Sequence, residues 1–164
     1  MKKFEIVCIV EEYNSIDEIP VQYKTLIIAA NEALTSAYAP YSNFQVGAAL
    51  LVDDDCIVKG SNQENAAYPS GLCAERVAFF SAGSQYPGKE IKAIAITTSF
   101  PLENPIAPCG ACRQVMAEYE LKQKSPIKII LSHNGGNIYI LNSMMDLLPL
   151  YFSGEWLKIG RIVG

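Results

Sequence analysis

The chain has 164 residues, of which half are hydrophobic and 18% are charged, and its formal net charge is -4. This length is sufficient for a single domain over residues 1–164, and the composition is ordinary for a compact soluble protein. The basic residues form no stripe and no apolar run is long enough to span a membrane, so we expect neither a nucleic-acid polymer nor a membrane as a partner.

The N-terminal pattern is not that of a secretion signal, because Glu5, Glu11 and Glu12 interrupt any apolar core. We therefore expect a cytoplasmic protein, in which thiols stay reduced. Five cysteines in that compartment favour metal binding or packing over disulfides.

Hydrophobic periodicity predicts strands that alternate with helices. In the first half of the chain, we expect a strand at 4–10, a helix at about 20–38, and a hairpin of strands at 44–52 and 56–60 around a polar turn at 53–55. A helix at 73–82, closed by Gly83, and a strand at 91–98 follow. The second half continues with a helix at 109–120, strands at 127–131 and 138–141, and a short helix at 143–148 capped by Ser143. The strand at 91–98 is almost continuously apolar, which predicts burial on both of its faces. The pattern predicts an α/β fold, a three-layer sandwich with helices on both faces of a mixed sheet of about five strands, and one extra strand from the N-terminal segment.

Three cysteines stand where two of the expected helices begin. Cys109 and Cys112 form a C-x-x-C, and Cys73 stands two residues before Glu75. A C-x-x-C alone is as often redox-active or half of a structural zinc site. Three thiols beside a carboxyl group fit a hydrolytic zinc site better, because such a site needs three protein ligands, an open position for water and a base. Helix N-termini also favour thiolates.

Glu75 and Arg76 are candidates for two supporting roles. Glu75 could move protons between water and substrate, although an acidic residue in a first turn can also serve the helix dipole alone. A zinc ion with three thiolates has a net negative charge, which weakens it as a Lewis acid. Arg76, about one turn after Cys73, could offset this charge by hydrogen bonding to the thiolates, or it could be an ordinary solvated arginine.

The two cysteine segments, 73–76 and 108–115, resemble those of the small, homotetrameric, zinc-dependent cytidine deaminases. A zinc site with a nearby glutamate that is not a ligand is a known pattern of zinc deaminases in general. The resemblance extends to residues 38–50, 60–69 and 147–152, and it leaves residues 1–20 as an N-terminal extension. Because the first ligand is Cys73 rather than histidine, the chain differs from the nucleic-acid-editing and tRNA-type deaminases and from the larger dimeric cytidine deaminases.

The resemblance implies one Zn²⁺ per subunit, held by Cys73, Cys109 and Cys112, and a role in pyrimidine salvage. The implied reaction is hydrolytic deamination of cytidine and 2′-deoxycytidine to the uridines and ammonia, with Glu75 protonating N3 of the base and then the leaving amino group. The resemblance also implies substrate contacts: Phe44 on the pyrimidine, Asn62 and Glu64 at the ribose 3′-hydroxyl, the Ala74 amide at the base carbonyl, the Ala107 carbonyl at the amino group, Ala66 and Tyr68 near the 5′-hydroxyl of a neighbouring subunit's site, and Phe152 over a neighbour's base.

Each of these positions also has an ordinary structural interpretation. Phe44 could belong to the core, Asn62 and Glu64 could be polar loop residues, and Tyr68 and Phe152 could pack within one subunit. Outside the motifs, we expect Cys8 and Cys56 to be packing residues and His133 to be an exposed surface residue.

Two other functions remain open at this point. A relative with the same chemistry could act on another aminopyrimidine nucleoside, such as a blasticidin-type antibiotic. A structural zinc module that serves an interaction would need a fourth protein ligand.

Overall fold

The computed structural model describes residues 1–53, 55–154 and 157, and it contains a six-stranded sheet with the order β1-β6-β5-β4-β2-β3. The strands are β1 (Glu11–Tyr13), β2 (Val46–Val52), β3 (Cys56–Ser61), β4 (Ile91–Thr98), β5 (Lys128–Leu131) and β6 (Ile138–Leu141). Only β4 and β5 are parallel, and the other neighbouring strands are antiparallel. The predicted mixed sheet and its hairpin are confirmed.

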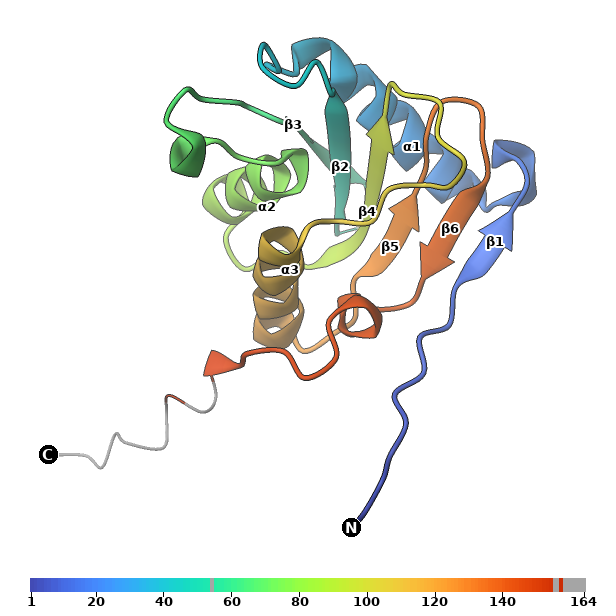
Figure 1. Ribbon diagram of the computed structural model, residues 1–164, viewed down its shortest axis with the longest axis vertical. Coiled ribbons are helices and arrows are strands. Elements are labelled where there is room, and N and C mark those ends of the chain that lie inside the picture. Colours follow the sequence, from blue (N-terminus) through green and yellow to red (C-terminus); the bar gives the residue numbers. More distant parts are fainter. Residues whose placement is uncertain (54, 155–156, 158–164) are drawn as a thin grey trace, which may run out of the picture.

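Three α-helices cover the sheet. They are α1 (Val21–Ala33), α2 (Ala74–Gln85) and α3 (Gly110–Gln123), and short 3₁₀ turns follow at η1 (Ile16–Glu18), η2 (Leu34–Ser36), η3 (Tyr68–Ser70) and η4 (Met144–Leu147). The helix α1 lies on one face of the sheet, while α2 and α3 lie side by side on the other (Figure 1). This arrangement is the predicted α/β sandwich. No helix in the described part of the chain combines the length and the apolar character that crossing a membrane requires.

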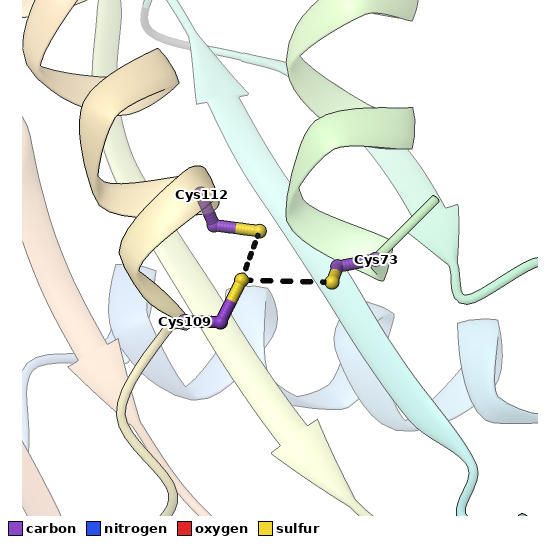
Figure 2. Close-up of side chains that lie close together, drawn as sticks. All are labelled: Cys73, Cys109 and Cys112. Carbon is purple, nitrogen blue, oxygen red and sulfur yellow. Dashed lines mark hydrogen bonds between the residues drawn. The ribbon is translucent and has the colours of Figure 1, made fainter. Parts of the chain in front are cut away.

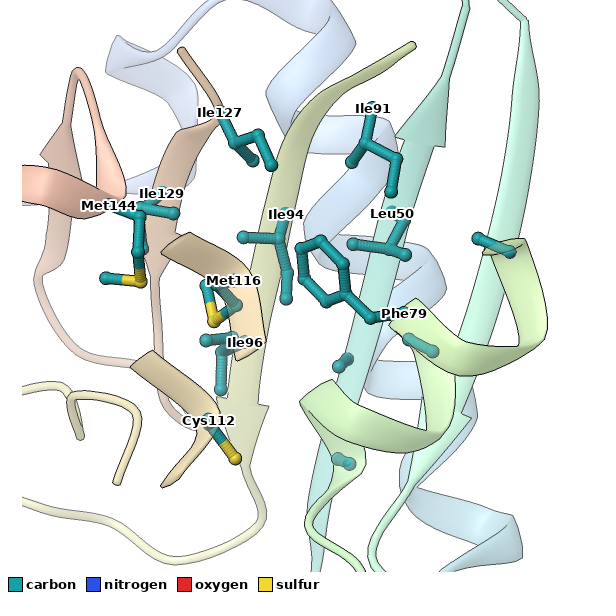
Figure 3. Close-up of a cluster of buried hydrophobic side chains, with 14 of the residues drawn as sticks. Leu50, Phe79, Ile91, Ile94, Ile96, Cys112, Met116, Ile127, Ile129 and Met144 are labelled. Atoms are coloured by element: carbon teal, nitrogen blue, oxygen red, sulfur yellow. The ribbon is translucent and has the colours of Figure 1, made fainter. Parts of the chain in front are cut away.

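The central strand β4 is buried on both faces, as its apolar run predicts. Ile94 and Ile96 pack with Phe79 of α2 and Met116 of α3, whereas its alternate residues face α1 (Figure 3). Successive side chains of a strand point to opposite faces, so one strand contributes to both cores. The two cores fix the positions of the helices relative to the sheet.

The predicted strand at 4–10 is wrong. The extra N-terminal strand is β1, which begins at Glu11 and pairs antiparallel with β6, with Glu11 opposite Ile140. Since β6 ends at Leu141, residues before Val10 would extend past the end of their only neighbouring strand. A strand therefore forms only where β6 offers backbone partners.

Three smaller predictions also need correction. The helix α2 does not close at Gly83 but continues to Gln85, and a Cβ on Gly83 would lie 2.4 Å from the Tyr119 hydroxyl. His133 is buried rather than exposed, and Cys8 is exposed rather than packed, whereas Cys56 packs against the core as expected. In the polar turn at 53–55, Asp54 lies outside the described residues.

Candidate metal and active site

Three thiols from two helices converge on one point. Cys73 is the N-cap of α2, Cys109 is the N-cap of α3, and Cys112 lies in the first turn of α3. The Sγ atom of Cys109 is 3.8 Å from that of Cys73 and 3.5 Å from that of Cys112, and all three sulfurs lie within 4.8 Å of one another (Figure 2). The predicted three-sulfur cluster is present.

Local packing holds both helix starts in place. A Cβ on Gly60 of β3 would lie 2.5 Å from the Ala74 carbonyl oxygen and from the Ala78 amide nitrogen, so α2 presses directly on the sheet. At the start of α3, Arg113 donates to the carbonyl oxygens of Pro108 and Leu147, at 2.7 and 2.8 Å. These contacts leave little freedom in the spacing of the three sulfurs.

The thiol cluster fits a zinc ion. A tetrahedral site with Zn–S bonds of about 2.3 Å places its sulfurs about 3.8 Å apart, which is close to the observed separations of 3.8 and 3.5 Å. Thiolates and a tetrahedral arrangement are the preference of zinc among the common metals. Among the described residues, no fourth histidine, cysteine or carboxylate ligand joins the three cysteines. Cys73, Cys109 and Cys112 would therefore hold the metal and leave one position for another ligand.

Cys73 ionises more readily than an ordinary cysteine. Hydrogen bonds from Cys112, Arg76 and Cys109 lower its pKa to about 5, although burial acts in the opposite direction. The same contact with Cys73, together with burial, raises the pKa of Cys112. At neutral pH the cluster thus carries negative charge before any metal binds, which favours a cation there.

Arg76 lies against this charge, as the sequence predicts. Its Nη2 is 3.9 Å from the Cys73 Sγ and 3.5 Å from the Gly71 carbonyl oxygen. Burial acts to lower the pKa of Arg76, but its contacts with Cys73 and Cys112 outweigh this and raise it. The guanidinium is therefore a permanent positive charge beside the thiolates.

Glu75 is a buried carboxyl group next to the thiols. It lies in the first turn of α2 with 4% of its surface exposed, and its carboxyl hydrogen-bonds with Cys112. Burial raises the pKa of this carboxyl, against the effect of the hydrogen bond from its own backbone amide. A carboxyl group in this environment takes up a proton more readily than one in water, which suits a proton carrier.

A cleft of about 540 Å³ opens beside the thiols. It brings together five of the predicted site residues, which are Asn62, Glu64, Tyr68, Cys73 and Arg76. The rest of its lining comes from Tyr41, Ser42, Gln63, Asn65, Gly71 and Leu72. The volume and the polar side chains among the lining residues suit a small molecule that carries hydrogen-bonding groups.

Asn62 and Glu64 fasten the loop that precedes β2. The side-chain amide of Asn62 accepts from the Val46 amide and donates to the Phe44 carbonyl, both at 2.8 Å. The Glu64 carboxylate accepts from the Tyr41 amide at 2.9 Å and from the Ser42 hydroxyl. The Ser42 hydroxyl, and then the Tyr41 amide, hold the pKa of Glu64 below its usual range. Both side chains thus have a structural role in addition to any contact with a ligand.

Phe44 does not enter the core but stacks on Phe100. Their ring centroids are 5.1 Å apart and the rings are inclined by 15°. This pair joins the loop before β2 to the loop after β4, which leads to Ala107 and Cys109. Sequence reasoning did not identify Phe100, because a single aromatic residue in a proline-rich loop has no periodic pattern around it.

Four further predicted residues do not line the cleft, namely Ala66, Ala74, Ala107 and Phe152. Ala74 is buried at the first residue of α2, whereas Ala66 and Ala107 are exposed. Phe152 is 63% exposed, and its carbonyl oxygen accepts a hydrogen bond from Gln114 of α3. Tyr68 lines the cleft but is 79% exposed, and it meets Tyr41 edge-on at 6.3 Å.

His133 is a buried residue that sequence reasoning placed at the surface. Its Nδ1 accepts from the Leu102 amide at 3.4 Å, and its Nε2 lies 3.2 Å from the Asn137 Oδ1. Asn137 in turn donates to Glu12 of β1 at 2.6 Å. These hydrogen bonds of His133 and Asn137 anchor the loop that carries Phe100 and Ala107. Gly136 was a usable signal, since a Cβ there would lie 1.9 Å from the imidazole.

Known proteins resemble this chain in both sequence and fold. The family model described as the cytidine and deoxycytidylate deaminase zinc-binding region matches residues 20–125. A cytidine deaminase of Halalkalibacterium halodurans is 43% identical over 130 residues, which are 79% of this chain and 93% of that protein. A crystal structure of a cytidine deaminase from Burkholderia pseudomallei has a TM-score of 0.70 and 46% identity, and covers 78% of this chain and 97% of its own. One from Mycobacterium tuberculosis has a TM-score of 0.64 and 35% identity, and covers 82% of this chain and 99% of its own.

Proposed function

The chain belongs to the cytidine and deoxycytidylate deaminase family, and from this premise we propose that it hydrolyses free cytidine and 2′-deoxycytidine to the corresponding uridines and ammonia. The observation that carries the proposal is the cluster of three thiols with the buried Glu75 beside it. The reaction consumes one water molecule and replaces the C4 amino group of the base by oxygen. We place it in pyrimidine salvage in the cytoplasm.

Zinc is the cofactor of this site, one ion per subunit, held by Cys73, Cys109 and Cys112. When bound, the ion supplies a Lewis acid that lowers the pKa of water and so provides a nucleophile at neutral pH. Arg76 keeps the three thiolates from cancelling this effect, because its Nη2 lies 3.9 Å from the Cys73 sulfur.

Glu75 is the proton carrier in the proposal. Its carboxyl takes one proton from the attacking water and delivers it to N3 of the pyrimidine. It then takes the second proton of that water from the hydroxyl group now on C4 and gives it to the amino group, which leaves as ammonia as the C4–N bond breaks and the C4 carbonyl forms. The burial that raises its pKa supports this role, because a carboxyl with a pKa nearer neutrality both accepts and donates readily. Such acid–base catalysis typically contributes a factor of ~10²–10⁴ in rate.

Specificity for a free nucleoside is assigned to the residues around the cleft. Phe44 packs on the base, the Ala74 amide and the Ala107 carbonyl contact its polar edge, and Asn62 and Glu64 bind the ribose 3′-hydroxyl. The Asn62 amide and the Glu64 carboxylate are already fixed by hydrogen bonds to the loop at 41–46, so they need little reorganisation when a ribose binds.

We also propose a homotetramer with sites shared between subunits. Ala66 and Tyr68 would approach the 5′-hydroxyl in a neighbour's site, and Phe152 would cover a neighbour's base. The exposure of Tyr68 and Phe152 in the single chain supports this part of the proposal, since large apolar side chains at the surface mark interaction sites.

A structural zinc module is disfavoured, because the cluster has only three protein ligands among the described residues and a cleft opens next to it. The identity of the nucleoside is tested by steady-state turnover of cytidine, 2′-deoxycytidine and a blasticidin-type nucleoside. We expect turnover of the first two at similar efficiency and little of the third. Efficient turnover of the third alone would replace the proposed substrate while keeping the chemistry.

A further inference from the structure

The N-terminal segment at 4–10 is rich in apolar residues that the described part of the chain leaves exposed. Its five large apolar residues, Phe4, Ile6, Val7, Ile9 and Val10, are exposed by 44% to 76%. The segment runs on from β1 and away from the body of the molecule (Figure 1). Contiguous exposed apolar side chains of this kind mark an interaction surface. The family match begins at residue 20, so the deaminase site does not account for this surface.

The segment joins the free edge of the sheet. The strand β1 is the last strand in the sheet order, and among residues 1–53, 55–154 and 157 it pairs with β6 alone, which leaves the backbone groups on its other edge without a strand partner there. Residues 4–10 are rich in Ile, Val and Phe, which favour strands. An edge strand that continues into such a segment is a template for the addition of another strand.

The charges that flank the segment indicate that the added strand is the same segment of a second copy of the chain. Lys2 and Lys3 precede the apolar residues, and Glu11 and Glu12 follow them. If two copies pair antiparallel about Val7, then Lys3 lies opposite Glu11 and Lys2 lies opposite Glu12. A shift of one residue in either direction leaves one lysine without a glutamate, and a parallel pairing sets lysine against lysine. Opposite charges across a strand pair stabilise it, and like charges destabilise it.

We propose that residues 2–12 pair antiparallel with the same segment of a second copy of the chain, centred on Val7. The pairing brings the exposed apolar side chains of the two copies side by side, and it links the two sheets through the segments that precede β1. This interface goes beyond the proposed function, because it uses residues outside the family match and touches none of the site residues. Both glutamates already accept a hydrogen bond in their own chain, Glu11 from the Tyr13 hydroxyl and Glu12 from Asn137. We choose Lys3 with Glu11 for the test because this pair lies nearer the centre of the proposed strand pair.

Cysteine cross-linking of the full-length, zinc-loaded chain tests the register. In a Cys8→Ser background, the substitution Val7→Cys places two thiols directly opposite each other at the centre of the pair. The matched control, Glu5→Cys, offsets the two introduced thiols by four residues, which is roughly 13 Å along the strand and beyond the reach of a disulfide. Mild oxidation should give a covalent dimer with Val7→Cys and not with the control. Equal cross-linking of the two variants, or none, would overturn the proposal.

Charge reversal tests the partner. In the Val7→Cys background, Lys3→Glu or Glu11→Lys alone should slow cross-linking by at least about threefold, because each replaces two attractive pairs by repulsive ones. The double variant Lys3→Glu/Glu11→Lys should restore the original rate, since both pairs are then reversed together. Failure of this restoration would contradict pairing between copies, as would binding of the segment to anionic lipid vesicles in place of cross-linking. Cytidine turnover should stay unchanged in all variants, which separates this test from that of the deaminase.

Discussion

Arg76 illustrates how a single side chain tunes the metal site. Its guanidinium meets the Cys73 sulfur at 3.9 Å, while its Nε is buried and has no hydrogen-bond partner within the described residues. A buried donor is costly to leave unpaired, so the contact with the thiolates is the reason to keep an arginine at this position. The residue acts on the reaction through the charge of the ligands rather than by touching the substrate.

Replacing Arg76 by Ala should weaken both zinc retention and turnover. Removal of an outer partner of a metal ligand typically costs ~10–100-fold in affinity or activity. Zinc loss to a chelator, followed by a colorimetric metal assay, measures the first effect, and kcat on cytidine measures the second. Arg76→Lys should recover part of both, and Lys59→Ala on the surface serves as the control. Kinetics and zinc retention equal to those of the parent chain would refute the charge-compensation role.

The lowered pKa of the Glu64 carboxyl predicts that the stability of the protein depends on pH. Its folded-state pKa is lowered, first by the Ser42 hydroxyl and then by the Tyr41 amide, so its ionised form stabilises the fold. This contribution is present above its unfolded pKa, which is about 4.3, and is lost as the pH falls through the lower folded value. The difference in Tm between the parent chain and Glu64→Gln should be present at pH 7 and should shrink in the acidic range below about pH 4. A difference that grows on acidification would contradict the assignment.

At the scale of elements, the contact of α2 with the hairpin places Cys73 and Glu75. Gly60 allows this contact, because any side chain at that position would meet the backbone of α2. Because this contact determines where α2 lies on the sheet, it also determines the position of Cys73, which is the N-cap of α2. The geometry of the site is therefore set by backbone packing as well as by the ligands.

Gly60→Ala should destabilise the protein by about 1–3 kcal/mol and reduce zinc affinity, since α2 must move to accommodate the new methyl group. Denaturant unfolding measures the stability, and chelator competition measures the affinity. Gly154→Ala is the control, because a Cβ there has its nearest neighbour at 3.8 Å. If Gly60→Ala were as stable as the control, then α2 would not be fixed by this contact.

The sequence predicted the zinc site well because its signals are local. The spacing of Cys109 and Cys112, and the placement of Cys73 and Glu75 at a helix start, depend on one turn of helix each. The alternation of strands and helices likewise predicted the sandwich. Residues whose state depends on distant partners were not predictable in the same way. The strand at 4–10 failed because β6 ends too early, and His133 is buried because loops far apart in sequence close over it.

At the scale of the whole molecule, one chain does not complete the proposed pocket. Phe152 and Tyr68 are 63% and 79% exposed in the single chain, and the proposal assigns their cover to another subunit. The proposed zinc ligands and Glu75, in contrast, come from one chain. A shared site requires closed symmetry, in which each subunit gives and receives the same residues. The oligomer is thus a functional prediction rather than a matter of stability alone.

Mixed oligomers test this sharing. Phe152→Ala and Glu75→Gln subunits should each have low activity alone, because each lacks one part of the pocket. In co-expressed mixtures at equal amounts, about a quarter of the sites combine an intact Glu75 with a neighbour's intact Phe152, so activity should exceed the sum of the parents. Activity equal to the weighted average of the two variants, or a fully active monomer, would contradict sharing.

In the proposed mechanism, the three thiols hold a zinc ion beside Glu75, and Glu75 carries protons while cytidine is deaminated. It is tested most directly by measuring zinc content together with the loss of cytidine absorbance for the parent chain and for Glu75→Gln. We expect about one zinc per chain in both proteins, turnover of cytidine by the parent, and a ~10²–10⁴-fold lower kcat for the variant. Full cytidine turnover by a zinc-loaded Glu75→Gln protein would contradict it.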